Sequence, residues 1–104
     1  MSIHSKVGTD RTTEHRRVLI SGLLVTPAGD RRVMIRDISP SGAQVTSREK
    51  IPNGCDAILK RGPLFVAARV ASVNGDEASL HFYRELSDDE IERALMATAL
   101  GGGS

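Results

Sequence analysis

The stretch Asp37-Ile38-Ser39-Pro40-Ser41-Gly42 is the most informative part of this chain. It places a carboxylate, a hydroxyl and a glycine in the pattern D-x-S-x-x-G, directly after a strand-like run. The carboxylate accepts hydrogen bonds, the hydroxyl both donates and accepts them, and the glycine lets the backbone approach a bound group closely. The pattern alone is equally typical of a turn held by its own side chains, so its meaning depends on its surroundings.

Six short strand-like runs, separated by turn signals, surround this stretch. The turn signals include Pro27-Ala28-Gly29-Asp30 and Asn74-Gly75-Asp76. Several of the runs alternate apolar with polar side chains, as a strand with one buried face does. Short strands at this spacing predict a small antiparallel barrel or sandwich. The runs cover residues 18–26, 31–38, 43–46, 56–61, 64–73 and 78–82.

The last element has a helical pattern. Ser87 and Glu90 fit a capping box, and the acidic residues of this first turn suit the positive end of the helix dipole. The sequence therefore predicts one helix over residues 87–100, followed by a Gly-Gly-Gly-Ser tail at 101–104 to which we assign no function. Four apolar or small side chains share one face of this helix at the expected spacing: Ile91, Ala94, Leu95 and Thr98.

The bulk properties fit one small domain. The chain has 104 residues, of which 39% are hydrophobic and 26% are charged, enough for one modest core. We expect a flexible tail over residues 1–10 and a barrel domain with its helix over residues 11–100. Cys55 is the only cysteine, which excludes an intrachain disulfide. We expect a cytoplasmic location, because neither a signal peptide nor a membrane-spanning run is recognisable.

Charge is spread unevenly, although the formal net charge is only +1. Residues 1–36 hold seven basic and three acidic residues, whereas residues 85–93 hold one basic and five acidic residues. A small anionic ligand at the N-terminal end fits this polarity better than a long polyanion does. The chain has only two phenylalanines, one tyrosine and no tryptophan, so we expect no nucleic-acid partner that needs a stacking platform.

The sequence gives no sign of catalysis. No Ser/His/Asp or Cys/His arrangement is present, and the three histidines do not have the spacing of metal ligands. We therefore expect a binding protein that is not an enzyme, with no metal, no cofactor and no membrane insertion.

The strand order and the motif together resemble the PilZ domain, a family whose members often bind the bacterial second messenger cyclic di-GMP. The resemblance covers roughly residues 11–97. The second motif of the family, D/N-x-S-x-x-G, is matched in full, and Pro52-Asn53-Gly54 and Leu80-His81-Phe82 also look like the family. The resemblance implies an all-β fold, a small six-stranded antiparallel barrel with a C-terminal α-helix.

The first motif of the family, R-x-x-x-R before the first strand, is matched in part. Arg11 has His15 at the required spacing, followed directly by Arg16 and Arg17. A neutral imidazole offers one donor and no charge, whereas a guanidinium offers five donors. We expect this exchange to lower affinity by about tenfold or more, unless Arg16 takes the place of His15 after a one-residue shift of a flexible segment.

The resemblance also implies a site for cyclic di-GMP. The arginines would clamp its phosphates and guanines, because a planar guanidinium can bind either group bidentately. Asp37 and Ser39 would form hydrogen bonds with guanine, and Gly42 would leave the surface accessible to the ligand. Binding would order residues 9–17 over the barrel and change the surface that an unidentified protein effector meets. The implied ligand-binding residues are Arg11, Arg16, Arg17, Asp37, Ser39 and Gly42.

Two other functions remain open at the level of sequence. A PilZ-like barrel that binds no nucleotide would serve as a protein-interaction module, for instance in pilus or motility assembly. A small barrel with a basic N-terminal arm could instead bind nucleic acid, with an affinity that falls steeply with salt. The few aromatic residues and the near-neutral net charge disfavour the second function.

Overall fold

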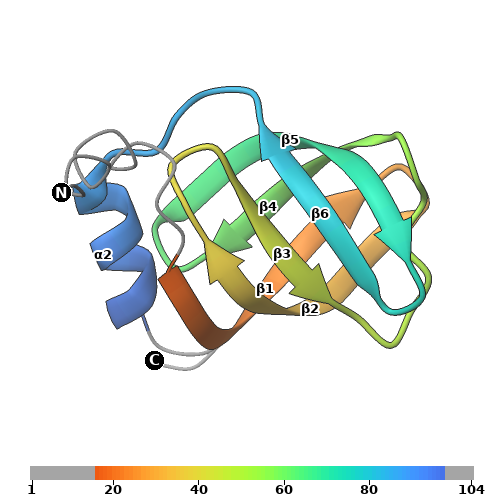
Figure 1. The fold of residues 1–104 in the computed structure, drawn as a ribbon, viewed down its shortest axis with the longest axis horizontal. Coiled ribbons are helices and arrows are strands. Elements are labelled where there is room, and N and C mark those ends of the chain that lie inside the picture. Colours follow the sequence, from red (N-terminus) through yellow and green to blue (C-terminus); the bar gives the residue numbers. More distant parts are fainter. Residues whose placement is uncertain (1–15, 98–104) are drawn as a thin grey trace, which may run out of the picture.

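The computed structural model describes residues 16–97, which form a closed barrel of six antiparallel strands with one helix at its end (Figure 1). The order of strands around the barrel is β1-β2-β3-β6-β5-β4. The predicted fold class is therefore confirmed. Arg11, His15 and the tail predicted for residues 1–10 lie outside the described residues. The elements are β1 (Arg16–Thr26), β2 (Gly29–Ile38), β3 (Gly42–Thr46), β4 (Asp56–Arg61), β5 (Leu64–Asn74), β6 (Glu77–Phe82) and α2 (Asp88–Met96).

The barrel starts with a tight hairpin and closes between two strands that are distant in sequence. Thr26 stabilises the β1–β2 turn, since its hydroxyl donates to the carbonyl of Gly29 at 2.7 Å and accepts from the amide of Ala28 at 3.1 Å. Gly29 has a φ of +124°, which an L side chain rarely adopts. Closure comes from β1 and β4, where Leu24 pairs with Leu59. Both side chains are fully buried in the barrel.

The core is aliphatic. Phe82 is the one aromatic ring in it, because Phe65 and Tyr83 lie on the surface. In β5 the alternate side chains from Leu64 to Val70 are buried, which confirms the alternation expected of a strand with one buried face. A fully buried Val, Leu or Ile side chain contributes about 1.5–3 kcal/mol relative to the exposed state. The buried aliphatic side chains together therefore account for most of the barrel's stability. The residues with no exposed surface include Leu24, Ile35, Ile38, Val45, Leu59 and Val70.

Two irregularities interrupt the strands at the end of the barrel that carries the D-x-S-x-x-G stretch. The β1–β2 register shifts between Arg17 and Ile20, and the β2–β3 register shifts between Ile35 and Asp37. An extra residue in β2 lets both Ile35 and Ile38 enter the core, while Asp37 between them stays half-buried. Strict alternation would have placed Ile38 outside, so the irregularity sets the direction of the motif that follows.

The start of α2 is as predicted, but its end is not. The Ser87 hydroxyl accepts from the amide of Glu90 at 3.1 Å, and the Glu90 carboxylate accepts from the amide of Ser87 at 2.9 Å, which completes the capping box. The helix ends at Met96, and Ala97 is extended. The prediction of a helix that continues to residue 100 is therefore wrong.

The buried side chain of Arg61 explains where the helix ends. Arg61 is only 5% exposed as a residue, and its guanidinium donates to three carbonyl oxygens: Ala94 at 2.7 Å, Ala97 at 2.6 Å and Ser21 at 2.7 Å. Helix carbonyls at a C-terminus have no partner within the helix. Arg61 supplies that partner from β4 and fixes α2 against β1. Burial lowers the pKa of Arg61 from its ordinary value.

Candidate functional site

The predicted site residues that the structure describes gather at one end of the barrel. The start of β1, the end of β2 and the turn into β3 all lie at the end covered by α2 (Figure 1). In the β1–β2 register Arg17 is opposite Asp37, and Arg16 is opposite Ile38. Five of the six predicted residues are thus brought together, and the sixth, Arg11, lies outside residues 16–97.

A row of polar side chains crosses the outer wall of the barrel at this point. Arg17 pairs with Asp37, Asp37 with Gln44, and Gln44 with Ser79, so one residue from each of β1, β2, β3 and β6 takes part. Directly opposed residues of antiparallel strands share a face, with Cβ atoms about 4.5–5.5 Å apart. The Ser79 hydroxyl donates to the Gln44 amide oxygen at 2.9 Å. The row therefore places a cation beside a carboxylate, with hydrogen-bonding groups next to them.

Arg16 and Arg17 belong to β1 itself. The first strand begins at Arg16, two residues earlier than predicted. The ordering on ligand binding that we predict for residues 9–17 therefore does not extend to these two arginines, because pairing with β2 already fixes their backbone. A one-residue shift of Arg16 toward the position of His15 would break the pairing with Ile38.

Arg16 also joins the barrel to the helix. Its Nη1 atom lies 2.6 Å from the Oε2 atom of Glu92 on α2. The two side chains are 37% and 53% exposed, so water screens the attraction, and such pairs contribute about 0–1 kcal/mol. The pair holds the guanidinium of Arg16 at the edge of the site.

Ser39 is fully buried within the motif turn. Its amide donates to the carbonyl of Gly42 at 2.9 Å, and its hydroxyl donates to the same oxygen at 3.3 Å. The Ser39 hydroxyl also lies 3.4 Å from that of Ser41. These contacts make Ser39 part of the turn's internal structure, and they hold Asp37 two residues away. Its direct contact with a ligand stays a prediction.

Gly42 is required by the packing of two strands. A Cβ atom at this position would lie 2.2 Å from the backbone oxygen of Leu80, so only a glycine lets β3 approach β6 this closely. Gly42 is paired with His81, which is exposed. The role of Gly42 in ligand access stays a prediction.

The turn is also tied to the segment that leads into α2. The carbonyl of Pro40 accepts from the amide of Leu86 at 2.9 Å, and that of Ser41 accepts from the amide of Phe82 at 2.8 Å. The motif turn, the end of β6 and the approach to the helix therefore form one connected unit.

A second ion pair, between Arg84 and Glu90, holds the first turn of α2. Arg84 holds Glu90 bidentately, with N–O distances of 3.0 and 2.8 Å, and also donates to the carbonyl of Phe65 at 3.3 Å. Mainly through this pair, and also through its bond to the amide of Ser87, the pKa of Glu90 falls to about 2. Beyond the capping role that the sequence predicts for the first turn, Glu90 and Glu92 also bind the helix to the rest of the domain.

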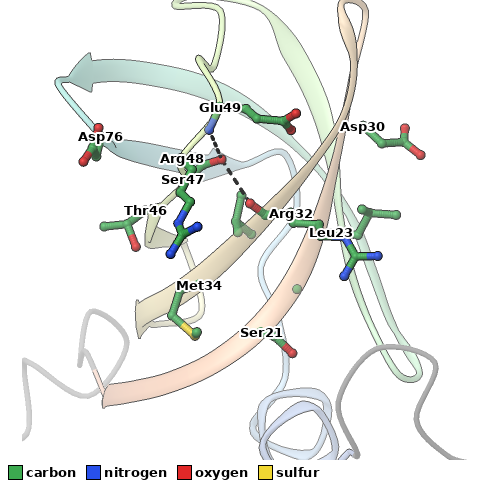
Figure 2. Close-up of a pocket in the computed structure, with 12 residues that line it drawn as sticks. Ser21, Leu23, Asp30, Arg32, Met34, Thr46, Ser47, Arg48, Glu49 and Asp76 are labelled. Atoms are coloured by element: carbon green, nitrogen blue, oxygen red, sulfur yellow. Dashed lines mark hydrogen bonds between the residues drawn. The ribbon is translucent and has the colours of Figure 1, made fainter.

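A separate open hollow of about 950 Å³ runs along the outer side of β1 and β2 (Figure 2). The Ser47 hydroxyl lies between the carbonyl of Arg32, to which it donates, and the amide of Glu49, from which it accepts. Two arginines and three acidic residues line the hollow, a mixture that suits a phosphate poorly. None of the predicted ligand-binding residues lines it. Its charged residues are Asp30, Arg32, Arg48, Glu49 and Asp76.

Comparison with known proteins agrees with this fold and with the motif. The family model of the PilZ domain matches residues 10–98, which include every predicted site residue. The chain therefore belongs to the PilZ domain family. No functionally curated protein matches it.

A solved structure shows the same fold. The crystal structure of the PilZ domain of CeSA from a cellulose-synthesizing bacterium superposes with a TM-score of 0.57 at 14% sequence identity. The match covers 85% of this chain and 96% of that chain.

The family membership gives a general class of function. PilZ domains are generally receptor domains for cyclic di-GMP, and they act as binding or adaptor domains rather than as enzymes. Among residues 16–97 no cluster of acidic, histidine or cysteine side chains is arranged to hold a metal. In the same range no helix has the length and apolar character needed to cross a membrane.

Proposed function

We propose that this chain is a cyclic di-GMP receptor that passes the binding event to a protein effector as a changed surface. One observation carries the proposal: Arg17 lies directly opposite Asp37, next to a complete D-x-S-x-x-G turn, in a chain of the PilZ family. This pairing places a guanidinium beside a carboxylate. A ligand that contains both phosphates and guanines can form hydrogen bonds with each of these groups.

The chemistry of the two side chains fits the two parts of the ligand. The guanidinium of exposed Arg17 can bind a phosphate or the O6 and N7 atoms of guanine. The carboxylate of Asp37 can accept from the N1–H and N2–H groups on the opposite edge of guanine. Half-burial reduces the competition from water at Asp37, which strengthens these hydrogen bonds.

Ser39 and Gly42 act mainly as positioning residues in this proposal. The bonds from Ser39 to the Gly42 carbonyl fix the turn directly after Asp37, and Gly42 permits the close contact of β3 with β6. Their loss would displace the Asp37 carboxylate, so both residues support affinity even without touching the ligand.

Arg16 supplies the link from ligand to helix. A ligand phosphate near Arg16 would compete with the carboxylate of Glu92, because both are anions that the same guanidinium can hold. When phosphate replaces Glu92, α2 loses this ion pair with the start of β1 but keeps the contacts made through Arg61 and Arg84. The free energy available for this change is the difference between two binding free energies of the ligand: one for the arrangement with the Arg16–Glu92 pair and one for the arrangement without it.

Calorimetric titration of the full chain with cyclic di-GMP tests the proposal. We expect binding by the wild type and a loss of at least about tenfold in affinity for Arg17→Ala and for Asp37→Ala. Arg36→Ala is the matched control, since Arg36 is an exposed arginine on β2 next to Asp37 and has no role in the proposed site. Equal losses in all three variants would refute the site, and the absence of any heat up to about 1 mM ligand would refute the function.

A further inference from the structure

Two of the three aromatic side chains lie exposed on one side of the barrel, away from the row formed by Arg17 and Asp37. Phe65 is 58% exposed and Tyr83 is 57% exposed. The register of β4, β5 and β6 places Lys60 opposite Phe65 and Ile58 opposite Ala67. The amide of Tyr83 donates to the carbonyl of Ala67 at 3.0 Å, which continues the same ladder. We call this surface the aromatic face; it consists of Ile58, Lys60, Phe65, Ala67, Arg69 and Tyr83.

Tyr83 is held at both ends on this face. Its backbone continues β6, and its hydroxyl donates to the carboxylate of Asp56 on β4. Because β5 lies between β4 and β6, the ring must extend across β5, where the small side chain of Ala67 leaves room. A ring anchored in this way loses little side-chain freedom when a partner covers it.

Two cations, Lys60 and Arg69, and one carboxylate, Asp56, lie on or beside the aromatic face. The ammonium group of Lys60 lies 5.7 Å from the centre of the Phe65 ring, and Arg69 is exposed opposite Asp56 and His81. The carboxylate of Asp56 accepts from the Tyr83 hydroxyl and keeps its negative charge, whereas Glu90 is paired with Arg84. The aromatic face therefore carries one more cation than carboxylate, and an acidic segment complements it better than a basic one does.

We propose that the aromatic face docks an acidic segment of a protein partner. An apolar side chain of the partner packs between Phe65 and Tyr83, and carboxylates on either side of it pair with Lys60 and Arg69. Tyrosine and arginine at the centre of a contact are the residues that most often dominate binding between proteins. The small aliphatic groups of Ile58 and Ala67 favour an apolar side chain of a protein over a nucleic-acid backbone.

The location of the aromatic face connects it with the ligand site. Gly42 of the motif is paired with His81, and His81 is paired with Arg69 of the aromatic face. The carbonyl of Ser41 also accepts from the amide of Phe82, the residue before Tyr83. The docking surface deepens the proposed adaptor function by naming its partner surface, but docking itself does not require the nucleotide.

Selection of random peptides displayed on phage against the full chain, without cyclic di-GMP, tests the docking surface. We expect the selected peptides to carry Asp or Glu on both sides of Leu, Ile or Phe. A synthetic peptide of the selected sequence should bind Phe65→Ala and Tyr83→Ala at least about fivefold more weakly than the wild type. It should bind Lys60→Glu more weakly still, because that variant puts a like charge opposite the peptide.

Two controls make the outcome decisive. Met34→Ala removes an exposed apolar side chain of β2, outside the aromatic face, and should leave peptide affinity unchanged. Lys60→Glu tests the same face without truncating a ring, should a ring variant fail to fold. Selected peptides that lack acidic residues, or that bind all these variants equally, would overturn the proposal.

Binding of a labelled oligothymidine that is lost in Tyr83→Ala would assign the face to single-stranded nucleic acid instead. Since no cyclic di-GMP is added, failure of cyclic di-GMP binding would leave this result unaffected.

Discussion

The Nη1 atom of Arg16 and the Oε2 atom of Glu92 lie 2.6 Å apart, and this pair connects the first residue of β1 with α2. A side chain predicted to bind an anionic ligand is therefore already bound to an anion of the protein. Ligand affinity must include the displacement of that carboxylate. The same displacement would remove a contact of α2 and so couple ligand binding to the helix.

Removing the negative charge of Glu92 should strengthen ligand binding. In Glu92→Gln the phosphate no longer competes with a carboxylate for Arg16, and we expect cyclic di-GMP affinity to rise about two- to fivefold. The free energy of unfolding should change by less than about 1 kcal/mol, because the pair is half-exposed. Calorimetry measures the first quantity and urea denaturation the second. Asp89→Asn, which breaks the exposed Arg93–Asp89 pair, is the control and should leave affinity unchanged.

The depressed pKa of Glu90 predicts a loss of stability in acid. Its folded-state pKa is about 2 against an ordinary value of 4.5, chiefly because Arg84 binds the carboxylate. The folded state therefore binds this proton less readily, so the stabilisation is complete above pH 4.5 and disappears as the pH falls toward 2. In Glu90→Gln the capping box can persist without a titrating group. As the pH falls from 4.5 toward 2, the denaturant midpoint of this variant should therefore fall less steeply than that of the wild type. Equal pH slopes for the two proteins would contradict the role of the Arg84–Glu90 pair.

Gly42→Ala should destabilise the barrel through a steric contact. The new Cβ would stand 2.2 Å from the Leu80 carbonyl, and separating β3 from β6 should cost about 3 kcal/mol. Gly54→Ala is a matched comparison: its φ is +80°, but nothing lies within 4 Å of its Cβ, so only backbone strain of about 1 kcal/mol is expected. Chemical denaturation measures both values. A smaller loss at Gly42 than at Gly54 would show that the strands separate easily there.

Arg61→Met should loosen the end of α2. The substitution removes the guanidinium that donates to the carbonyls of Ala94, Ala97 and Ser21, while the Ala94 carbonyl still accepts from the amide of Ala97 at 3.3 Å. A buried acceptor that loses its donor costs about 1–3 kcal/mol. We expect unfolding free energy to fall by about 3 kcal/mol and amide exchange in the last turn of the helix to accelerate. Arg48→Met, at an exposed arginine, should change neither. Unchanged exchange in Arg61→Met would mean that packing of Ile91 and Ala94 alone fixes the helix.

Local sequence signals were sufficient for the strands, the turns and the start of the helix. Alternation identified the inward face of β5, and the spacing of Ser87 and Glu90 identified the cap. These features depend on neighbours within a few residues, so their pattern is visible in the chain itself.

Features made by residues distant in sequence could not be predicted. Arg61 looked like an ordinary strand residue, yet it caps a helix more than thirty residues later and so determines where that helix ends. The irregularity after Ile35 depends on the register with β3, and the partner of Arg16 lies on α2. For the site, the motif showed which residue types gather, but the burial of Ser39 and the pairing of Arg17 with Asp37 required the closed barrel.

An amide chemical-shift titration of the full chain with cyclic di-GMP tests the central claim most directly. We predict saturable shifts at Arg16, Arg17 and residues 37–42, together with shifts on α2 around Glu92 as its ion pair is replaced. The shifts of the motif should vanish in Asp37→Ala and persist in Arg36→Ala. A spectrum that stays unchanged throughout the titration, or shifts confined to other parts of the barrel, would contradict the claim that this site binds the nucleotide.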